Sequence, residues 1–337
     1  MARKNTVTLA DVARATGVSL ATASKALNAR EGISPATRAR VRVAARELGY
    51  APSVARGGPP GRPTVGVLFE SLGGSLYSLR LLEGITAASA ELGVEIVLAA
   101  LSVPGHWRST VTSEWVHSNV SRTWDALIVV TSQLTRAAAE ACAALGVAVI
   151  EIDPIHQLDI RMPSIGSTNW AGAAQATDYL ISLGHTDIAF IDLVELPVFA
   201  QRRGGHRHAM EAASLPLRIT EPLERIVDLP QVVRGLLSGP DRPTAVFAPV
   251  DSAAIGVIRA AAERGLRVPQ DLSVVGFDDA YAGAWHSPTL TTVRQPLLQM
   301  GRTAIVLALE AAAGAELPAH TQLPTELVVR ESTAPRG

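Results

Sequence analysis

The sequence has little that points to a disulfide-stabilised or membrane protein. Of its 337 residues, one is cysteine and 4% are aromatic. The single cysteine, Cys142, excludes an internal disulfide and a cysteine-cluster metal site, and its alanine-rich helical surroundings predict a buried core residue. No window holds the roughly eighteen uninterrupted apolar residues of a membrane span. The first residues, MARKNTVTLADV, include no apolar segment and do not form a secretory signal, so we expect a cytoplasmic protein.

Motifs of the common enzyme classes are absent as well. The chain has no phosphate-binding loop, no Gly-x-Ser-x-Gly elbow and no His-Glu-x-x-His metal pair. His206 and His208 stand close together, but a third ligand is not in view, which favours surface positions over a metal site. We expect no enzyme activity, no cofactor and no metal.

Charge is divided unevenly along the chain. Residues 1–62 hold eleven Lys or Arg and three acidic residues, a net charge of +8, whereas the whole chain is −1 and the remainder is therefore −9. A small basic segment on an acidic body is typical of nucleic-acid-binding proteins. The length and the 47% hydrophobic content suffice for two or three domains with a large core.

Two short helices are predicted within the stretch VTLADVARATGVSLATASKALN. Thr8 can cap a first helix over residues 9–16, which Gly17 ends in the left-handed conformation. Ser19 can cap a second helix over residues 20–27. This spacing is typical of a helix-turn-helix, whose second helix lies in the DNA major groove. Plain packing helices share the periodicity, so it is the basic surroundings that favour DNA binding.

A third helix should follow the first two. It begins at Ser34, with Pro35 at its first position, and runs to about Leu48. Residues 1–50 would thus form a three-helix head. Residues 51–63, APSVARGGPPGRP, are rich in Pro and Gly and form the clearest linker in the chain.

Three runs in this head, TLADVARATGVS, ATASKALN and ISPATRARVRVAARELGYAPS, resemble the DNA-binding domain of the lactose-repressor (LacI/GalR) family of bacterial transcription regulators. The resemblance implies that the start of the second helix contacts base edges. Leu20 and Ala21 offer only apolar contact there, and Lys25 is the candidate donor to guanine, unless it contacts phosphate instead. The other head positions that the resemblance places at the DNA are Thr8, Leu9, Ser19, Thr22, Ser24, Asn28, Ser34 and Thr37.

The linker departs from the family pattern. Members usually read Pro-Asn-x-x-Ala-Arg-x-Leu, in which a hinge helix forms on DNA and the leucine enters the minor groove. Here residues 52–58 are one residue shorter and have glycines in place of that leucine, which disfavours a helix and a kink in the DNA. Arg56 is the residue expected to enter the minor groove, with Val54 a weak substitute for the leucine.

From residue 64 onward, short apolar strands alternate with helices. Unbroken apolar strands indicate parallel sheets covered on both faces, and two such units in tandem predict two α/β lobes. The predicted strands cover 64–69, 94–100, 126–130, 147–152, 187–193, about 225–228, 244–249 and 273–278. The predicted helices cover about 76–92, 108–120, 134–145, 170–183, 201–213, 230–238, 252–264 and 295–313.

This body resembles the periplasmic-binding-protein-like (type I) domain that follows the head in the same family, through LISLGHTDIAFI, ERGLRVPQDLSVVGFDD and PTLTTVRQPLLQMG. The resemblance implies three crossovers between the lobes, near 162–166, 290–294 and 322–327. The body, 64–337, would then comprise a first lobe of about 64–163 and 293–323 and a second lobe of about 164–292 and 324–337, the last stretch partly shared.

Ligands of two-lobed α/β folds bind between the lobes, at the carboxyl ends of the strands. Asp278 and Asp279 follow such a strand, and the resemblance implies that the first of them accepts hydrogen bonds from an effector; the alternative is a solvated turn. Arg202 matches the family's effector-binding arginine, and Arg203 takes its place if the alignment shifts by one.

Five further residues complete the predicted effector site, each at a strand end or a helix start. Trp170 offers a platform for a sugar ring but is equally suited to core packing. One polar contact of the family is missing, because Val250 stands where members often have Asn. The five residues are Tyr77, Asp153, Asn169, Trp170 and Asp251.

These features predict a homodimeric transcription repressor in the cytoplasm, associated with the nucleoid. Two heads would bind palindromic operator DNA, and a small carbohydrate between the lobes would alter the spacing of the heads. One alternative is a DNA-binding regulator that ignores ligands, which the altered linker favours. Another is a cytoplasmic small-molecule-binding protein, against which the basic head argues.

Overall fold

The computed structural model describes residues 9–19, 22, 23, 26, 34, 37, 40, 41, 44, 62–70, 72, 75–101, 110–121, 123–155, 162–194, 196–223, 228–280 and 286–336, with the backbone alone at residues 9 and 10. The chain divides into two compact units, Met1–Gly57 and Gly58–Gly337. We call the first unit the head and the second the body. The division falls within the stretch 51–63 that the sequence predicts as a linker.

The head contains the beginning of the predicted helix-turn-helix. Helix α1 (Leu9–Thr16) is followed by Gly17, whose φ of 66° is a left-handed conformation that glycine adopts readily. Ser19 then caps the next helical segment, because its Oγ accepts a hydrogen bond from the backbone N–H of Thr22 at 3.1 Å. A small apolar core joins the described helical segments and consists of Val12, Ala13, Ala23, Ala26 and Val41.

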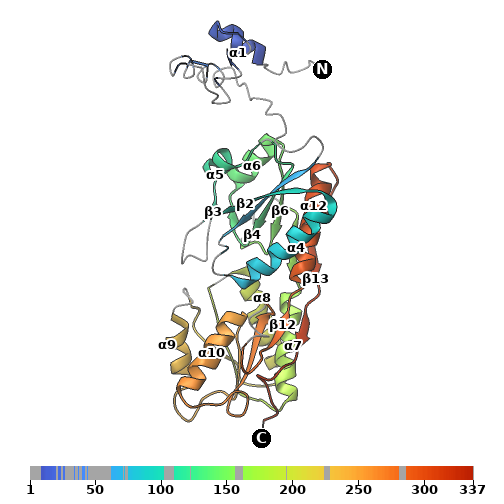
Figure 1. The fold of residues 1–337 in the computed structure, drawn as a ribbon. Coiled ribbons are helices and arrows are strands. Elements are labelled where there is room, and N and C mark those ends of the chain that lie inside the picture. Colours follow the sequence, from blue (N-terminus) through green and yellow to red (C-terminus); the bar gives the residue numbers. More distant parts are fainter. Residues whose placement is uncertain are drawn as a thin grey trace. The chain divides into compact units, whose positions relative to one another are not determined.

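The first lobe of the body is a parallel sheet with helices on both faces (Figure 1). Its strands are β1 (Thr64–Phe69), β2 (Glu95–Ala100), β4 (Ala126–Val130), β6 (Ala148–Ile152), β7 (Ser164–Ser167) and β13 (His320–Leu323). Their order is β13-β7-β6-β4-β1-β2, and every neighbouring pair is parallel. The helices are α4 (Leu76–Leu92), α5 (Ser113–Asn119), α6 (Arg136–Leu145) and α12 (Leu297–Ala312).

Alternate residues of these strands fill two cores, as expected for a sheet buried on both faces. Val67 and Ile128 pack toward α4 and α12, and Leu68 and Leu127 pack toward α5 and α6. Cys142 of α6 lies in the second of these cores, which confirms its predicted burial. Two short strands, β3 (Thr110–Val111) and β5 (Gln133–Leu134), form a separate small sheet.

The second lobe repeats the design. Its strands are β8 (Ile188–Phe190), β9 (Arg218–Ile219), β10 (Ala245–Phe247), β11 (Ser273–Asp278), β12 (Thr291–Arg294) and β14 (Glu326–Val328), in the order β14-β12-β11-β10-β8-β9. All pairs are parallel except β12 with β14. The helices are α7 (Asn169–Ser182), α8 (Pro197–Ala212), α9 (Leu229–Leu236) and α10 (Asp251–Glu263). None of the helices in the described ranges is long and apolar enough to cross a membrane.

Three elements of the second lobe differ from those predicted, by three or more residues at one end or in their position. The strand expected over 187–193 ends at Phe190, and the backbone N–H of Asp192 donates to the Thr220 side chain instead of to a strand. Helix α8 begins at Pro197 and not at 201, because proline is well suited to the first turn of a helix. The strand expected near 225–228 lies almost wholly outside the described residues, and β9 pairs with β8 instead.

The chain passes between the lobes at Thr168, at residues 295–296 and at residues 324–325. The sequence predicts the first two crossovers a few residues earlier, and it assigns 164–167 to the second lobe. That assignment is wrong because β7 pairs with β6 and β13 in the first sheet. Thr168 and Thr325 join two of the crossovers, since their Oγ1 atoms lie 2.9 Å apart and the backbone N–H of Thr325 donates to Thr168 Oγ1 at 2.9 Å.

Candidate effector site between the lobes

Two aspartates lie at carboxyl ends of strands in the two lobes. Asp153 directly follows β6, and Asp278 is the last residue of β11. Both have positive φ angles, 45° and 115°, which L residues adopt only when the surrounding structure holds them there. Both are buried, at 3% and 8% exposure. The backbone thus holds two carboxyl groups at the strand ends, where ligands of such folds bind.

Arg202 of α8 is the centre of the polar contacts on the second lobe. Its Nε donates to Asn169 Oδ1 at 2.8 Å, and its Nη1 donates to the Pro249 carbonyl at 2.6 Å and to Asp278 Oδ1 at 3.3 Å. The guanidinium also lies 3.8 Å from the centre of the Phe277 ring, a cation–π contact. Four partners therefore fix a guanidinium that is only 3% exposed.

Close packing of α7 and α8 makes this geometry possible. A Cβ at position 205 would lie 2.1 Å from the Trp170 carbonyl oxygen, so only glycine allows the two helices to approach this far. The approach brings Arg202, three residues before Gly205, within hydrogen-bond distance of Asn169 at the start of α7.

The first lobe faces this arginine with Tyr77 and Asp153. The Tyr77 hydroxyl donates to Asp153 Oδ2 at 2.6 Å. Burial and the neighbouring Asp153 carboxylate raise the pKa of Tyr77 well above its usual range, so the phenol remains a neutral donor. Burial raises the pKa of Asp153, although the Tyr77 hydrogen bond and the Arg202 charge oppose the rise. The charge of Arg202 acts on both Asp153 and Tyr77, and that of Asp278 acts on Tyr77, so the polar groups of the two lobes lie within electrostatic range of one another. We call Tyr77, Asp153, Asn169, Arg202 and Asp278 the interlobe cluster.

Carboxyl groups outnumber cations at this cluster. Burial raises the pKa of Asp278 to about 6, against the opposing effects of Arg202 and Gln295. Burial also raises the pKa of Asp251 well above its usual range, and the Asp278 carboxylate adds to the rise. Asp153 Oδ1 has no hydrogen-bond partner among the described residues. An arrangement of buried acceptors around one guanidinium suits a ligand that carries many hydroxyl groups, because each hydroxyl both donates and accepts.

The structure distinguishes the members of the two adjacent pairs, Asp278 and Asp279, and Arg202 and Arg203. Asp279 does not face the cluster, because its two oxygens accept from Arg294 Nε and Arg330 Nη2, each at 2.7 Å. Arg203 does not bind Asp278 but pairs with Asp192. The first aspartate and the first arginine of each pair therefore belong to the interlobe cluster.

Asp251 lies behind the cluster and not within it. Its Oδ1 accepts from the Thr292 hydroxyl at 2.6 Å, and its Oδ2 accepts from the backbone N–H of Ala280 at 3.2 Å. With 4% exposure, it holds β12 and the segment after Asp278 in place. Its role in the described structure is to position the Asp278 loop.

Trp170 does not join the cluster. Its side chain is 43% exposed and its ring lies 4.9 Å from that of His208 on α8. Since successive helical residues are about 100° apart, the inward direction of Asn169 turns the next side chain outward. His206 is also not a surface residue as expected: it is fully buried, and its Nδ1 lies 3.0 Å from the Thr177 hydroxyl.

Sequence reasoning missed Gln295 and Ser167. Gln295 Nε2 donates to Asp278 Oδ1 at 2.7 Å, and Gln295 Oε1 accepts from the Ser167 hydroxyl at 2.6 Å. The one available signal was the place of Gln295 directly after the crossover predicted near 290–294. A polar residue at a predicted crossover is a candidate for contact with both lobes.

In the head, the structure describes four of the predicted DNA-contacting side chains. The hydroxyls of Ser19 and Thr22 lie 2.8 Å apart, and those of Ser34 and Thr37 are paired in the same way at 2.8 Å. Each serine also accepts from the backbone N–H of its threonine, so both serines cap the helical segments that follow. Leu9 is described in backbone alone, and the predicted positions outside the described residues are Thr8, Leu20, Ala21, Ser24, Lys25, Asn28 and Arg56.

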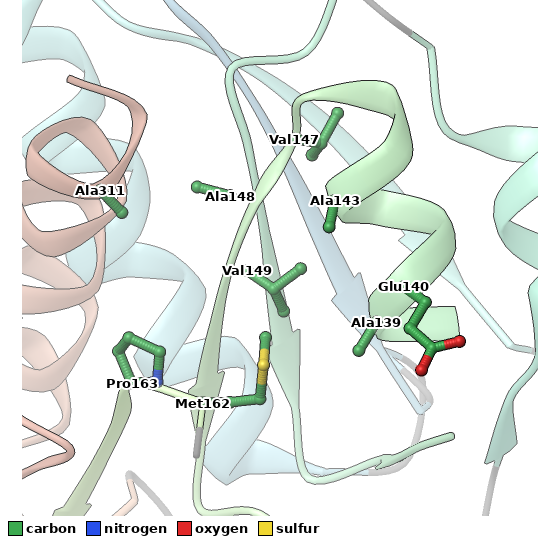
Figure 2. A pocket seen from close by; sticks show the side chains of 9 residues that line it. All are labelled: Ala139, Glu140, Ala143, Val147, Ala148, Val149, Met162, Pro163 and Ala311. Atoms are coloured by element: carbon green, nitrogen blue, oxygen red, sulfur yellow. The ribbon is translucent and has the colours of Figure 1, made fainter. Parts of the chain in front are cut away.

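A separate apolar hollow of about 380 Å³ lies on the first lobe between α6, the start of β6 and α12 (Figure 2). Its lining includes Met162, Val149 and Ala311, and Glu140 is its one charged residue. It shares no residue with the interlobe cluster. Within the described ranges, no group of three His, Cys, Asp or Glu side chains is placed to hold a metal ion.

Comparison with known proteins gives a consistent family for head and body. Residues 8–53 match the family described as bacterial regulatory proteins, lacI family, and residues 177–333 match the periplasmic binding protein-like domain. The chain is 30% identical to catabolite control protein A of Priestia megaterium, over 97% of this chain and 99% of that protein.

Two solved structures are similar over 97% of this chain and 99% of their own, both at 27% identity. One is the transcriptional regulator CelR in complex with cellobiose, with a TM-score of 0.69, and the other is the lac repressor dimer bound to operator and the anti-inducer ONPF, with a TM-score of 0.71. The chain therefore belongs to the lacI family of bacterial regulatory proteins, and is a DNA-binding transcriptional regulator rather than an enzyme.

Proposed function

We propose that this protein represses sugar-utilisation genes and that a small carbohydrate, bound at the interlobe cluster, controls its affinity for operator DNA. The observation that carries the proposal is the buried Arg202–Asp278 pair of the second lobe, which faces Tyr77 and Asp153 of the first. Carboxylate oxygens accept from sugar hydroxyls, and the guanidinium and phenol donate to sugar oxygens. A sugar held from both sides would stabilise one arrangement of the lobes over others.

The relatives support a sugar as the effector. The CelR structure contains cellobiose, and another similar structure, of a LacI family regulator from Enterococcus faecium, contains ribose. The second of these shares 25% identity with this chain at a TM-score of 0.70. Both likenesses extend over the body, in which the interlobe cluster lies.

For the DNA-bound state we propose that the second helix of the head enters the major groove and that Lys25 donates to a guanine or to a phosphate. The capped helix starts at Ser19 and Ser34 support contacts to phosphate, because backbone N–H groups at a helix start attract anions. Two heads would read a palindromic operator on the chromosome, in the cytoplasm.

A homodimer would provide the two heads that a palindromic operator requires. The first lobe has an apolar surface on which two copies could associate. β2 is an edge strand of the first sheet, and α4 packs against it. Large apolar side chains on both are 39–44% exposed, a group that a second copy would cover: Leu76, Leu79, Leu92, Val97 and Leu98. The lac repressor structure is itself a dimer on operator DNA.

A thermal-shift screen of the full-length protein against mono- and oligosaccharides, with purine bases and amino acids as controls, tests this function. A sugar present at a hundred times its dissociation constant should stabilise the body by about 2.7 kcal/mol. Stabilisation by a sugar that is lost in Asp278→Asn would support the proposed site. Stabilisation by a purine or amino acid alone would contradict a carbohydrate effector, and the lack of any shift would favour a regulator that ignores ligands.

A further inference from the structure

A second aspartate–arginine pair lies beside the interlobe cluster, at the end of the neighbouring strands. Asp192 follows β8 by two residues, and Pro249 follows β10 by two residues. Phe190 pairs with Phe247, and the backbone N–H of Ile191 donates to the Phe247 carbonyl. If this register continues by two residues, Asp192 lies opposite Pro249. Neighbouring strands are about 4.8 Å apart. The backbone of Asp192 is therefore about one strand spacing from the carbonyl that binds Arg202.

The two arginines that serve these pairs are adjacent on α8. Arg203 Nη1 lies 2.5 Å from Asp192 Oδ2, just as Arg202 Nη1 lies 3.3 Å from Asp278 Oδ1. The side chain of Asp192 is 3% exposed, while that of Arg203 is 24% exposed and reaches solvent. The second pair thus extends the row of polar groups along the carboxyl edge of the sheet, away from Asp278.

Within the described structure, only one oxygen of the Asp192 carboxylate, Oδ2, has a hydrogen-bond partner. Its Oδ1 is buried and has no hydrogen-bond partner among the described residues. Asp279, by contrast, has both oxygens engaged by Arg294 and Arg330, as expected for a structural aspartate. Burying a carboxylate oxygen without a partner is costly, and such atoms are rare unless a ligand, ion or water engages them.

We propose that Asp192 and Arg203 form a second saccharide subsite, which binds the second unit of an effector whose first unit lies at Arg202 and Asp278. This inference rests on the proposed function and names its ligand class: a disaccharide or longer saccharide. A hydroxyl of the second unit donates to Asp192 Oδ1, and Arg203 donates to an oxygen of the same unit. The backbone of Asp192 and that of the residue before Asp278 are two strand spacings apart, about 10 Å, and a saccharide of two units is long enough to extend from one aspartate to the other.

Calorimetric titration of the full-length protein with matched sugars tests the subsite. The probes are cellobiose, maltose and lactose, together with glucose and galactose, the monosaccharides that compose them. We expect at least one disaccharide to bind about tenfold more tightly than its monosaccharides. Asp192→Asn removes that advantage and leaves monosaccharide affinity within about twofold.

The chain offers a matched control at the other end of the same strand. Asp187, just before β8, pairs with Arg218 at 3.3 Å, and both side chains are about one third exposed. Asp187→Asn should change neither affinity. Arg203→Gln, which keeps Asp192 intact, serves as a second variant if Asp192→Asn does not fold, and it too should lower the disaccharide advantage.

Other results overturn the subsite in distinguishable ways. Monosaccharides that bind as tightly as every disaccharide overturn it and leave the proposed function standing. A lower melting temperature in Asp192→Asn with an unchanged disaccharide preference shows that the pair is structural only. If none of the five sugars binds and no saccharide in the thermal-shift screen stabilises the protein, the subsite is overturned together with the carbohydrate effector.

Discussion

Gln295 lies between Asp278 and Ser167 and bonds to both, donating to Asp278 Oδ1 at 2.7 Å and accepting from the Ser167 hydroxyl at 2.6 Å. Gln295 occupies one crossover between the lobes, and Ser167 directly precedes another. Through these two hydrogen bonds the Asp278 carboxylate is connected to two of the three chain segments that join the lobes. We expect this connection to carry the effect of a ligand bound at Asp278 to the arrangement of the lobes.

Replacing Gln295 with methionine should weaken that connection. The side chain is 3% exposed, and its loss leaves Asp278 and Ser167 each without one partner. We expect a loss of about 1–3 kcal/mol in the stability of the crossovers. Hydrogen exchange of the backbone N–H groups at residues 295–297 and 167–169 measures it.

Gln322→Met is the matched control for this change. Gln322 also bonds to Ser167, through the backbone carbonyl at 3.2 Å, but its side chain is exposed and no contact joins it to Asp278 in the described structure. Equal exchange rates in the two variants would show that Gln295 has no special part in joining the cluster to the crossovers.

Arg202→Met should destabilise the body more than any change at an exposed arginine. Removing the guanidinium leaves Asn169, the Pro249 carbonyl and the buried Asp278 carboxylate without their shared donor. Breaking one half of a buried ion pair costs about 3–5 kcal/mol. Arg218→Met removes an ion pair that is one third exposed and should cost less than about 1 kcal/mol. Denaturant unfolding of the two variants measures the difference, and similar losses would contradict the assignment of Arg202 as the buried centre of the cluster.

His206 should make the body less stable in mild acid. It is fully buried between α7 and the rings of Phe190 and Phe247, and burial lowers its pKa from 6.5 to about 4. In the unfolded chain His206 becomes protonated below pH 6.5, whereas in the folded chain it becomes protonated only near pH 4. Stability is therefore full above pH 6.5 and falls as the pH drops to 4, by about 3 kcal/mol in all.

His206→Phe isolates this effect, because the Thr177 hydroxyl still donates to the Ala173 carbonyl when the imidazole is gone. Urea unfolding between pH 7 and pH 4.5 should show a shallower loss of stability in the variant than in the wild type. If the free energy of unfolding falls equally with pH in the variant and the wild type, folding does not lower the pKa of His206.

Glycine at position 301 should be required for the contact between α4 and α12. A Cβ at Gly301 would lie 2.6 Å from the Leu81 carbonyl oxygen, so Gly301→Ala forces the helices apart and should cost about 1–3 kcal/mol. Gly235 of α9 has open space where its Cβ would be, and Gly235→Ala should be neutral or stabilising by up to about 1 kcal/mol. Melting temperatures that move in the same direction for both would contradict the packing argument.

The exposed apolar residues of α4 and β2 should carry the proposed dimer. Leu98 is 44% exposed on the edge strand, and Leu98→Arg places a charge where a second copy would exclude water. Sedimentation equilibrium should find a dimer for the wild type and a monomer for the variant. A dimer that survives both Leu98→Arg and Leu79→Arg would place the interface elsewhere.

The sequence predicts buried strands better than it predicts the site. β1, β4 and β11 begin and end where expected, because a parallel strand buried on both faces reads as an unbroken apolar run. Asp192 was read as part of a strand because nothing in DIAFIDL marks the point at which pairing stops. Trp170 was included because it stands at the start of a helix and offers a platform for a sugar ring, and the sequence does not fix the rotation of that helix.

The site is harder to predict because its residues are far apart in the sequence and come together only in the folded body. Tyr77, Asp153, Arg202 and Asp278 were chosen from their positions after strands or from the family pattern, and the fold brings them together. Gln295 was not chosen, since its importance depends on contacts with positions 167 and 278 that exist only once the crossovers run side by side. Local patterns specify elements, whereas a site between two lobes is specified by the packing of the whole body.

The most direct test of the central claim is the affinity for operator DNA with and without a bound saccharide. An operator duplex selected from random-sequence DNA is titrated with the protein by fluorescence anisotropy, in the absence and in the presence of a saturating saccharide found in the thermal-shift screen. We predict a change in the dissociation constant of at least about tenfold, equivalent to a coupling of about 1.4 kcal/mol, and no change in Asp278→Asn. A dissociation constant that stays within twofold while the saccharide occupies the body would contradict the account.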